Sequence, residues 1–413
     1  MKNNMKKVGI VLVILCIFMG SLSSISAVDW TMYQGNTRHT GYVQQDTSFS
    51  TQAWSVKLDG EITVTPVLYG NHIYIGTHEG TLYSLDAQDG NETWTFDTEG
   101  AIESSPAVSG DTVYFGSDDG YLYSNNANSG TNNWKFKAGD SVKSSPTLDS
   151  EKVYFGSDDG SIYALNKDDG SVVWQYKTDD SIESSPVIDG DTLYVGSDDD
   201  KIYALDINDG SVKWTYNTGD DVKSSPAVAD GNVYVGSDDN QVYALNKDNG
   251  EEVWTYNAGS EVSSSASIDE RQSTLYIGTD DGDMYALDLR DGLKKWEVNV
   301  GGSINGTPTI FGTNVAVGSS SGTMHIYNKF TGNSVWSYNP GYIPNISGSI
   351  SASPTTSGGS LFMASEDGNV YSLDTNQQIG PTSIYAYYIV AVIIVAGCVI
   401  YSLKRWGFNR KND

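Results

Sequence analysis

The sequence predicts an all-β fold, an eight-bladed β-propeller of four-stranded blades, plus one C-terminal transmembrane helix. The first observation is an internal repeat: residues 101–140, 141–180, 181–220 and 221–260 align without a gap. Repeats of about 40 residues that hold four short strands are typical of propeller blades. The pattern extends to further copies at 61–100, 261–302 and 303–348, and to a partial copy at 349–376.

The second observation is one tryptophan in each full copy, with one more, Trp54, ahead of the first copy. The spacing between successive tryptophans is 40 residues, except for 42 residues between Trp254 and Trp296. Such regularity indicates that each tryptophan fills the same place in its blade. The eight residues are Trp54, Trp94, Trp134, Trp174, Trp214, Trp254, Trp296 and Trp336.

Four strands are expected in every full copy, and the copy at 141–180 illustrates them. Residues 143–148, 152–156, 161–165 and 172–177 are rich in Val, Ile, Tyr and Trp, which favour strands. Asp and Gly between these runs supply side-chain acceptors and the positive φ angle that tight turns need.

The chain ends are expected to close the ring together. The last copy supplies strands at 350–354, 361–364 and 370–373 but no tryptophan strand. Residues 53–56, near the N-terminus, form a tryptophan strand with no copy of their own. We expect the strand near 52–58 to complete the eighth blade, which removes an exposed sheet edge.

The third observation is an apolar segment near each end of the chain. Residues 1–27 contain lysines, an apolar run and then small residues, as in a secretory signal peptide. After a linker at 377–383, residues 384–403 are apolar over about one bilayer crossing. The basic tail at 404–413 indicates a cytoplasmic C-terminus. We therefore expect a single-pass cell-membrane protein whose propeller is extracellular or periplasmic.

Acidic side chains dominate the expected propeller at 28–376. Seven of the 24 basic residues and one of the 52 acidic residues lie in the terminal segments, which leaves 17 basic and 51 acidic groups and a net charge of −34. Such a surface repels phosphate, so the composition argues against nucleic acid as a partner. Both cysteines, Cys16 and Cys398, lie in the terminal segments, so the propeller depends on packing rather than on disulfides.

Two stretches carry a family resemblance. ALNKDDGSVVW at 164–174 resembles the tryptophan-docking motif of the PQQ-like, quinoprotein-type β-propeller repeat family, and DWTMY at 29–33 resembles the start of that family's domains. In that family the tryptophan packs against the glycine turn of the neighbouring blade. The resemblance therefore implies a structural, blade-docking role for the eight tryptophans.

That family includes both enzymes and non-catalytic members. Its dehydrogenases bind pyrroloquinoline quinone with calcium, and many use a vicinal cysteine pair. This propeller has no cysteine and no cytochrome attachment motif. Its only arginines, which could pair with the quinone's carboxylates, are Arg38, Arg271 and Arg290. These departures favour the non-catalytic branch, nearest the lipoprotein of outer-membrane assembly, with no cofactor expected. A calcium- and quinone-dependent dehydrogenase with a degenerate site is the alternative.

The turns between second and third strands place carboxylates on one face. Carboxylate oxygens suit calcium, but Asp and Gly are also good turn formers. The DxDxDG alternation of many calcium loops is absent, so a calcium site and a plain turn both stay open. The rim consists of Asp118, Asp119, Asp158, Asp159, Asp198, Asp199, Asp238, Asp239, Asp280 and Asp281, with Glu79, Asp200, Glu366 and Asp367 beside them.

The residue before each Ser-Ser-Pro alternates in charge, through Glu103, Lys143, Glu183 and Lys223. If the first strand lines the central channel, these four groups lie in neighbouring blades at one channel mouth. They then form either modest surface ion pairs or a charged mouth that selects a ligand.

Catalytic patterns are missing from the sequence. The four histidines, His39, His72, His78 and His325, are scattered over distant parts of the chain, and no Walker loop or zinc spacing is present. The sequence predicts a non-catalytic, membrane-anchored propeller that binds or scaffolds an envelope or cell-surface protein or a glycan. Pure surface architecture without a specific ligand is a further possibility.

Overall fold

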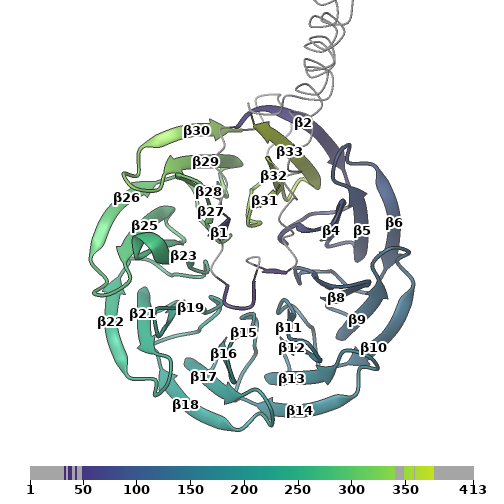
Figure 1. Ribbon diagram of the computed structural model, residues 1–413, viewed down its shortest axis with the longest axis horizontal. Coiled ribbons are helices and arrows are strands. Elements are labelled where there is room, and N and C mark those ends of the chain that lie inside the picture. The colour runs from purple at the N-terminus through teal and green to yellow at the C-terminus, as the bar shows by residue number, and fades with distance from the viewer. Residues whose placement is uncertain are drawn as a thin grey trace, which may run out of the picture.

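The computed structural model describes residues 32–33, 36–39, 42–43, 49–339, 348–357 and 359–375. Eight antiparallel four-stranded sheets stand around a central channel (Figure 1), one of them with an added parallel strand, which confirms the eight-bladed prediction. The expected signal peptide and transmembrane helix lie outside these residues. Within the described part, no helix is both long enough and apolar enough to span a bilayer.

Each blade runs from an innermost strand at the channel to an outermost strand at the rim. Blade 1 holds β3 (Val67–Tyr69), β4 (His72–Gly76), β5 (Thr81–Asp86) and β6 (Glu92–Asp97); blade 2 holds β7 (Ala107–Ser109), β8 (Thr112–Gly116), β9 (Tyr121–Asn126) and β10 (Asn132–Lys137); blade 3 holds β11 (Thr147–Leu148), β12 (Lys152–Gly156), β13 (Ser161–Asn166) and β14 (Val172–Lys177); blade 4 holds β15 (Val187–Asp189), β16 (Thr192–Ser197), β17 (Lys201–Asp206) and β18 (Val212–Asn217).

The other four blades repeat this order. Blade 5 holds β19 (Ala227–Ala229), β20 (Asn232–Gly236), β21 (Gln241–Asn246) and β22 (Glu252–Asn257); blade 6 holds β23 (Ser267–Asp269), the 3₁₀ turn η3 (Glu270–Gln272), β24 (Thr274–Gly278), β25 (Asp283–Asp288) and β26 (Lys294–Asn299); blade 7 holds β27 (Thr309–Phe311), β28 (Asn314–Ser319), β29 (Thr323–Asn328) and β30 (Ser334–Tyr338); blade 8 holds β31 (Thr355–Ser357), β32 (Ser360–Ala364), β33 (Asn369–Thr375) and β2 (Phe49–Lys57).

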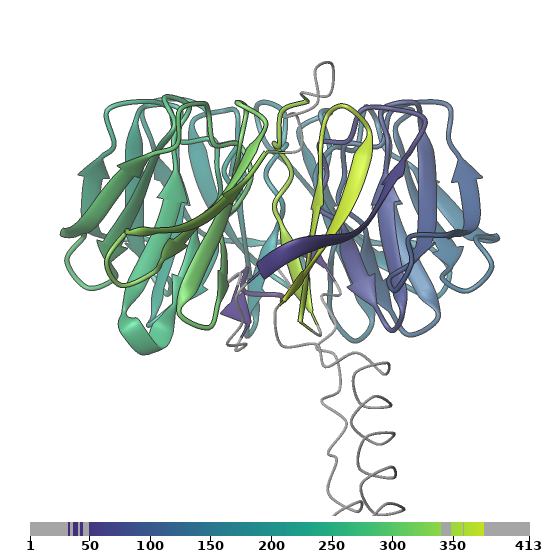
Figure 2. The same cartoon turned by 90° about the horizontal axis from the view of Figure 1, so that it is seen from above.

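The alternating strand directions give the ring two different faces. Turns between second and third strands, and the connections to the next blade, lie on what we term the mouth face. Turns between first and second strands, and between third and fourth strands, lie on the opposite rear face. Figure 2 shows the two faces edge-on.

The expected first strands of two blades are wrong in extent. In blade 3 the strand covers only Thr147–Leu148 instead of 143–148. Pro146 has no N–H for a ladder. Before it, the Ser144 hydroxyl donates to the Ser184 carbonyl and the Ser145 N–H donates to Ser185 Oγ, both in the next blade. In blade 8 the first strand is Thr355–Ser357, after the expected 350–354 rather than within it.

The eighth blade is closed by both ends of the propeller. Strand β2 pairs antiparallel with β33, with Trp54 opposite Ser372 and Val56 opposite Val370. This pairing confirms the predicted closure. It matters because an unpaired β33 would present an open sheet edge to other chains.

Tryptophan and glycine residues hold successive blades together. The Nε1 of Trp174 donates to the Ile207 carbonyl at 3.0 Å, and a Cβ atom on Gly210 would lie 2.7 Å from the indole ring. Gly210 also has a φ of +74°, which favours glycine. The same contact joins Trp54 to Gly90, Trp94 to Gly130, Trp134 to Gly170, Trp214 to Gly250, Trp254 to Gly292 and Trp296 to Gly332.

A segment before the first blade, which we term the N-terminal segment (residues 32–33, 36–39 and 42–43), lies inside the ring (Figure 1). The N–H groups of Ile188 and Val228 donate to the carbonyls of Thr37 and Arg38 at 2.8 and 3.0 Å. Strand β1 (Tyr42–Val43) pairs parallel with β27. The segment therefore contacts the innermost strands of blades 4, 5 and 7, toward their rear ends.

Candidate functional site: the channel mouth

A cavity of about 160 Å³ opens in the channel at the mouth face. Side chains from all eight blades line it in two rings, which follow from the repeat because each blade supplies equivalent positions. The outer ring is Thr63, Glu103, Lys143, Glu183, Lys223, Ser263, Asn305 and Ser351; the inner ring includes Thr65, Ser105, Ser145, Ser185, Ser225, Ser265 and Ser353.

The inner ring is a belt of hydrogen bonds from blade to blade. The N–H of Ser145 donates to Ser185 Oγ at 3.0 Å, and the N–H of Ser185 donates to Ser225 Oγ at 2.9 Å. The second serine of Ser-Ser-Pro thus satisfies a backbone donor of the preceding blade and forms a polar wall. The same bond joins Thr65 to Ser105, Ser105 to Ser145, Ser225 to Ser265 and Thr307 to Ser353.

Tyr33 of the N-terminal segment adds a phenol to this belt. Its Oη donates to Ser265 Oγ at 3.0 Å and lies 2.9 Å from Thr307 Oγ1. Its ring meets His39 edge-on at 5.4 Å. Burial lowers the pKa of His39 to about 4, so this imidazole is neutral at physiological pH. The repeat gave no signal for Tyr33, since this residue precedes the first copy.

The four alternating charges all reach the channel mouth, but only one pair of them is in contact. Lys143 Nζ lies 3.3 Å from Glu183 Oε1 and 3.0 Å from Asp158 Oδ2. Lys223 Nζ instead contacts Asp238 Oδ2 at 2.7 Å and Asp221 Oδ2 at 3.0 Å. Each lysine therefore has two carboxylate partners, one of them from the acidic turn of its own blade.

His78 is a mouth residue that the sequence reasoning missed. Its Nε2 lies 3.0 Å from Thr63 Oγ1 and 3.6 Å from Glu103 Oε1. The alignment contains a usable signal, because THEG at 77–80 corresponds to SDDG in other copies. His78 thus stands where most blades have the first aspartate of the turn.

The first aspartate of the turn, present in blades 2 to 6, belongs to the same mouth. Burial raises the pKa of Asp118, Asp158, Asp198 and Asp280, and neighbouring carboxylates raise it further. The pKa of Asp198 reaches about 7, because burial, Glu183 and Asp221 together outweigh Lys223. The mouth therefore concentrates negative charge in a partly enclosed place.

The second aspartate of the turn has a structural task. Asp159 Oδ2 accepts the Tyr163 hydroxyl at 2.6 Å and the Gly139 N–H at 2.8 Å. Burial opposes ionisation of Asp159, but these hydrogen bonds outweigh burial and lower its pKa. The arrangement recurs in Asp119 with Tyr123, Asp199 with Tyr203 and Asp239 with Tyr243. The acidic rim is thus two sets of residues with different roles. In blade 6 the equivalent Tyr285 hydroxyl donates instead to the Ala258 carbonyl at 3.0 Å.

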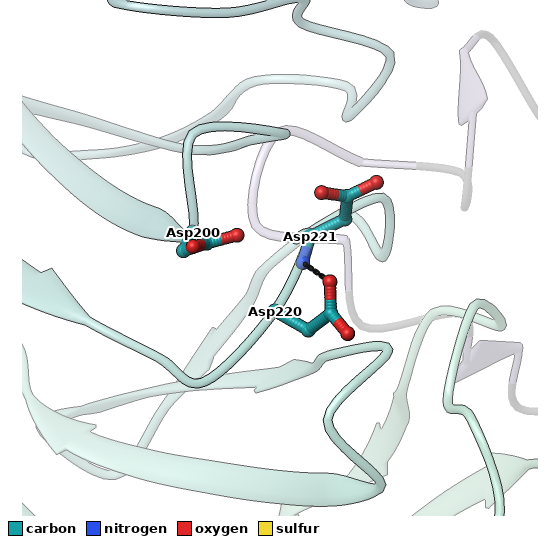
Figure 3. Close-up of side chains that lie close together, drawn as sticks. All are labelled: Asp200, Asp220 and Asp221. Atoms are coloured by element: carbon teal, nitrogen blue, oxygen red, sulfur yellow. Dashed lines mark hydrogen bonds between the residues drawn. The ribbon is translucent and has the colours of Figure 1, made fainter.

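Blade 4 carries an additional acidic group on the mouth face. Ligand oxygens of Asp200, Asp220 and Asp221 lie within 4.8 Å of one another (Figure 3), and Asp220 Oδ1 accepts the Asp221 N–H at 3.0 Å. Asp200 has a φ of +62° where the third blade has Gly160. Two of these three side chains are exposed. A calcium site on the rim, one of the two alternatives that the sequence leaves open, stays a hypothesis.

Comparisons with known proteins agree with this fold. The family profile described as "Beta-alanine-activating enzyme, beta-propeller" matches residues 166–402, and the profile "Outer membrane protein assembly factor BamB" matches residues 23–104 and 92–185. No curated protein sequence matches the chain.

Three solved structures illustrate the likeness. BamB from Moraxella catarrhalis is 23% identical with a TM-score of 0.66, covering 78% of this chain and 99% of its own. The quinohemoprotein alcohol dehydrogenase ADHIIG from Pseudomonas putida HK5 is 15% identical with a TM-score of 0.73, covering 86% and 81%. The computationally designed Ika8 protein is 14% identical with a TM-score of 0.70, covering 79% and 100%.

At these identities the solved structures show the fold alone, whereas one family profile matches more than half of the sequence. Together with the repeat and the tryptophan–glycine contacts, these matches place the chain: it belongs to the PQQ-like β-propeller family.

Proposed function

We propose that this chain is a non-catalytic binding propeller, anchored in a membrane by residues 384–403, whose channel mouth holds a polar group of an envelope or cell-surface protein or of a glycan. The observation that carries the proposal is the polar cavity itself. All eight blades contribute to its wall, and Tyr33 of the N-terminal segment adds a phenol to its inner ring. Such a recess suits the recognition of a group that enters from the mouth face.

The position of the chain exit supports an outward-facing mouth. Strand β33 ends at Thr375, and its residue Asp374 pairs with Ser360 at the start of β32. The end of β33 therefore lies beside the turn between β31 and β32, which is on the rear face. Eight residues, 376–383, separate this point from the proposed membrane segment. A chain of that length reaches at most about 28 Å. The rear face would then lie toward the bilayer, with the channel mouth pointing away from it.

The channel mouth is a poor binding site for the pyrroloquinoline quinone that the dehydrogenase alternative requires. The carboxylates of pyrroloquinoline quinone would face Glu103, Glu183 and Asp198. Two of the arginines are engaged elsewhere, Arg38 with Glu270 at 3.4 Å and Arg290 with Asp288 at 2.9 Å. Lys143 and Lys223 also line this mouth, but each is already paired with two carboxylates. The like charges and the engaged lysines therefore disfavour a tricarboxylate. These residues therefore support a binding role over quinone chemistry.

A thermal melt separates the two functions. The full chain in detergent is heated with EDTA, with calcium, and with calcium plus pyrroloquinoline quinone, and reduction of a dye by added alcohols is followed in parallel. A ligand at 100 times its Kd adds about 2.7 kcal/mol of stability. The proposal predicts no shift that requires the quinone and no dye reduction. A shift that needs both additions, with dye reduction, would establish the dehydrogenase instead.

A further inference from the structure

We infer that the rear edge of blades 6 and 7 rests on the lipid surface of the membrane that holds the chain. The inference rests on the proposed anchor at 384–403 and adds an orientation of the ring that an anchor alone does not give. We term this edge the rear patch; it consists of Arg271, Arg290, Leu293, Lys294, Phe330 and Val335.

Exposed apolar side chains gather on the rear face of the ring. Among the residues whose exposure the structure describes, seven large apolar side chains are exposed. All seven lie at the rear end of an outermost strand or in the turn before it, in blades 3 to 7. Single exposed apolar residues are ordinary, but their restriction to one face is informative. They are Val172, Val173, Val212, Val253, Leu293, Phe330 and Val335.

The most exposed of these side chains belong to blades 6 and 7. Leu293 is 67% exposed, and Phe330 and Val335 are about half exposed. The indole of Trp296 packs on Gly332 so closely that it leaves no room for a Cβ atom, which joins the two turns. Each of the three apolar residues lies within three positions of this contact along the chain. They therefore share one part of the rear edge.

A buried ion pair holds the turn that carries Phe330. Lys329 Nζ lies 2.7 Å from Asp269 Oδ2 of blade 6 and 5.3 Å from the centre of the Phe330 ring, and both members of the pair are buried. The Lys329 carbonyl also accepts the Trp296 Nε1–H at 3.0 Å. The exposed ring thus stands on a fixed turn, so little ordering is needed before it meets a surface.

The charge of this sector differs from that of the other blades. The rear segments of blade 6, at 269–274 and 288–295, carry four basic and four acidic residues, and those of blade 7, at 311–314 and 328–335, carry one basic and no acidic residue. In each of blades 1 to 5 the equivalent segments carry more acidic than basic residues. Lipid headgroups with a negative charge attract basic side chains and repel acidic ones. Blades 6 and 7 therefore oppose a lipid surface least.

Two of the three arginines in residues 28–376 lie in the rear patch. Arg290 binds Asp288 through Nε and Nη2, each at 2.9 Å, and its side chain stays 74% exposed. Lys295 Nζ donates to the Gln272 carbonyl at 3.0 Å, which holds η3, and with it Arg271, beside the same strand. A guanidinium has five N–H donors in a fork that matches phosphate oxygens, so Arg290 keeps donors for a headgroup.

The position of the patch suits the proposed anchor. Blade 7 lies between blade 6 and blade 8 (Figure 1), and the chain leaves blade 8 on the rear face. A ring held at one point of its edge is free to tilt, and the tether makes a weak contact sufficient to fix the tilt. On the other side of blade 8, the rear segments of blade 1, at 69–72 and 86–93, carry three acidic residues and no lysine or arginine. We therefore expect the ring to lean toward blades 6 and 7, with the apolar tips at the headgroup boundary.

The test is photo-cross-linking of the full chain in vesicles of phosphatidylcholine, alone or mixed with phosphatidylglycerol. A photoreactive residue replaces Leu293 or Phe330. The control position is Val212, which is exposed at the rear edge of blade 4, opposite blade 8 in the ring (Figure 1). Mass spectrometry should find at least fivefold more lipid adduct from positions 293 and 330 than from position 212. The yield should rise with phosphatidylglycerol, because its headgroup is negatively charged.

A variant tests whether the apolar tip makes the contact. Leu293→Glu adds a carboxylate at an exposed position, so the variant is expected to fold with an unchanged Tm. It should lower the lipid adduct from position 330 at least threefold. Val212→Glu is the matched change in blade 4 and should leave that yield as it is in the wild type.

An alkaline carbonate wash of the vesicles separates this inference from the proposed anchor. If the chain resists the wash but gives equal adducts at all three positions, or none, the inference is overturned and the anchor stands. Release by the wash without adducts overturns both, whereas release with adducts at 293 and 330 supports the patch and overturns the anchor. Cross-links between two copies of the chain in place of lipid adducts, a yield that falls with phosphatidylglycerol, or an unchanged yield in Leu293→Glu would also contradict the inference.

Discussion

The indole of Trp174 in blade 3 lies on Gly210 of blade 4, at a distance that leaves no room for a Cβ atom. Its Nε1 donates to Ile207 of the same neighbouring turn. One side chain therefore fills the space between two blades and satisfies a backbone carbonyl across their boundary. Because the contact recurs from blade to blade, we expect the stability of the ring to depend on it.

Replacing this tryptophan should cost much of the stability of the blade interface. Trp174→Ala removes a side chain that is only 7% exposed, and we expect a loss of about 3–5 kcal/mol. The neighbouring Val173 is 46% exposed, so Val173→Ala should change stability by less than about 0.5 kcal/mol. Urea unfolding followed by tryptophan fluorescence measures both. Equal midpoints for the two variants would argue against the docking role.

The bond from Tyr203 to Asp199 should also contribute to stability. The Asp199 side chain is 4% exposed, so Tyr203→Phe leaves a buried carboxylate with one donor fewer. We expect a loss of about 1–3 kcal/mol. Tyr216→Phe is the matched control, because its hydroxyl bonds to exposed Glu252. Thermal melts that show similar losses for both would mean that the second aspartate of the turn is not structural.

The stability of the ring should fall as Asp198 loses its proton. Burial first, and then Glu183, raise its pKa from 3.8 to about 7, so the folded chain keeps a proton that the unfolded chain releases. Stability is therefore greatest below about pH 4 for this group and declines through pH 7. Asp198→Asn stays neutral, and its Tm should fall less than that of the wild type between about pH 5 and pH 8. Parallel Tm profiles would refute this assignment.

Removal of the closing strand should open the ring. A chain that lacks β2 (Phe49–Lys57) leaves the edge of β33 without its partner. Open edges pair with other chains, so we expect dimers or larger species in light scattering after size exclusion. Adding back a synthetic peptide of residues 49–57 should restore the monomer. A deleted chain that stays monomeric and keeps its Tm would contradict closure through β2.

The number of blades and the closure could be predicted because both follow from the repeat. The positions of Trp54 and of the incomplete last copy are visible in the sequence, and the ring has one simple way to join them. The extent of the innermost strands could not be predicted as well. Propensity favours a strand through residues 143–148, but Pro146 and the serine hydroxyls divert the backbone bonds to the next blade.

The candidate site could be predicted only in part. The sequence places Glu183 and Lys223 at one mouth, but their contacts depend on which neighbour each side chain reaches. The sequence Ser197-Asp198-Asp199 likewise does not indicate that the two aspartates have different roles. Their roles differ because the hydroxyl of Tyr203, four residues after Asp199, donates to Asp199 in the folded blade. Tyr33 reaches the serine belt from outside the repeat, so no periodic pattern indicates it.

The central claim is that the mouth face binds a partner, and site-specific photo-cross-linking in intact cells tests it most directly. A photoreactive residue is placed at Asn240, in the mouth-face turn of blade 5, or at Asn208, in the rear-face turn of blade 4. The account predicts a discrete cross-linked product from position 240 and none from position 208. A product from position 208 alone, or no product from any mouth-face position, would contradict it.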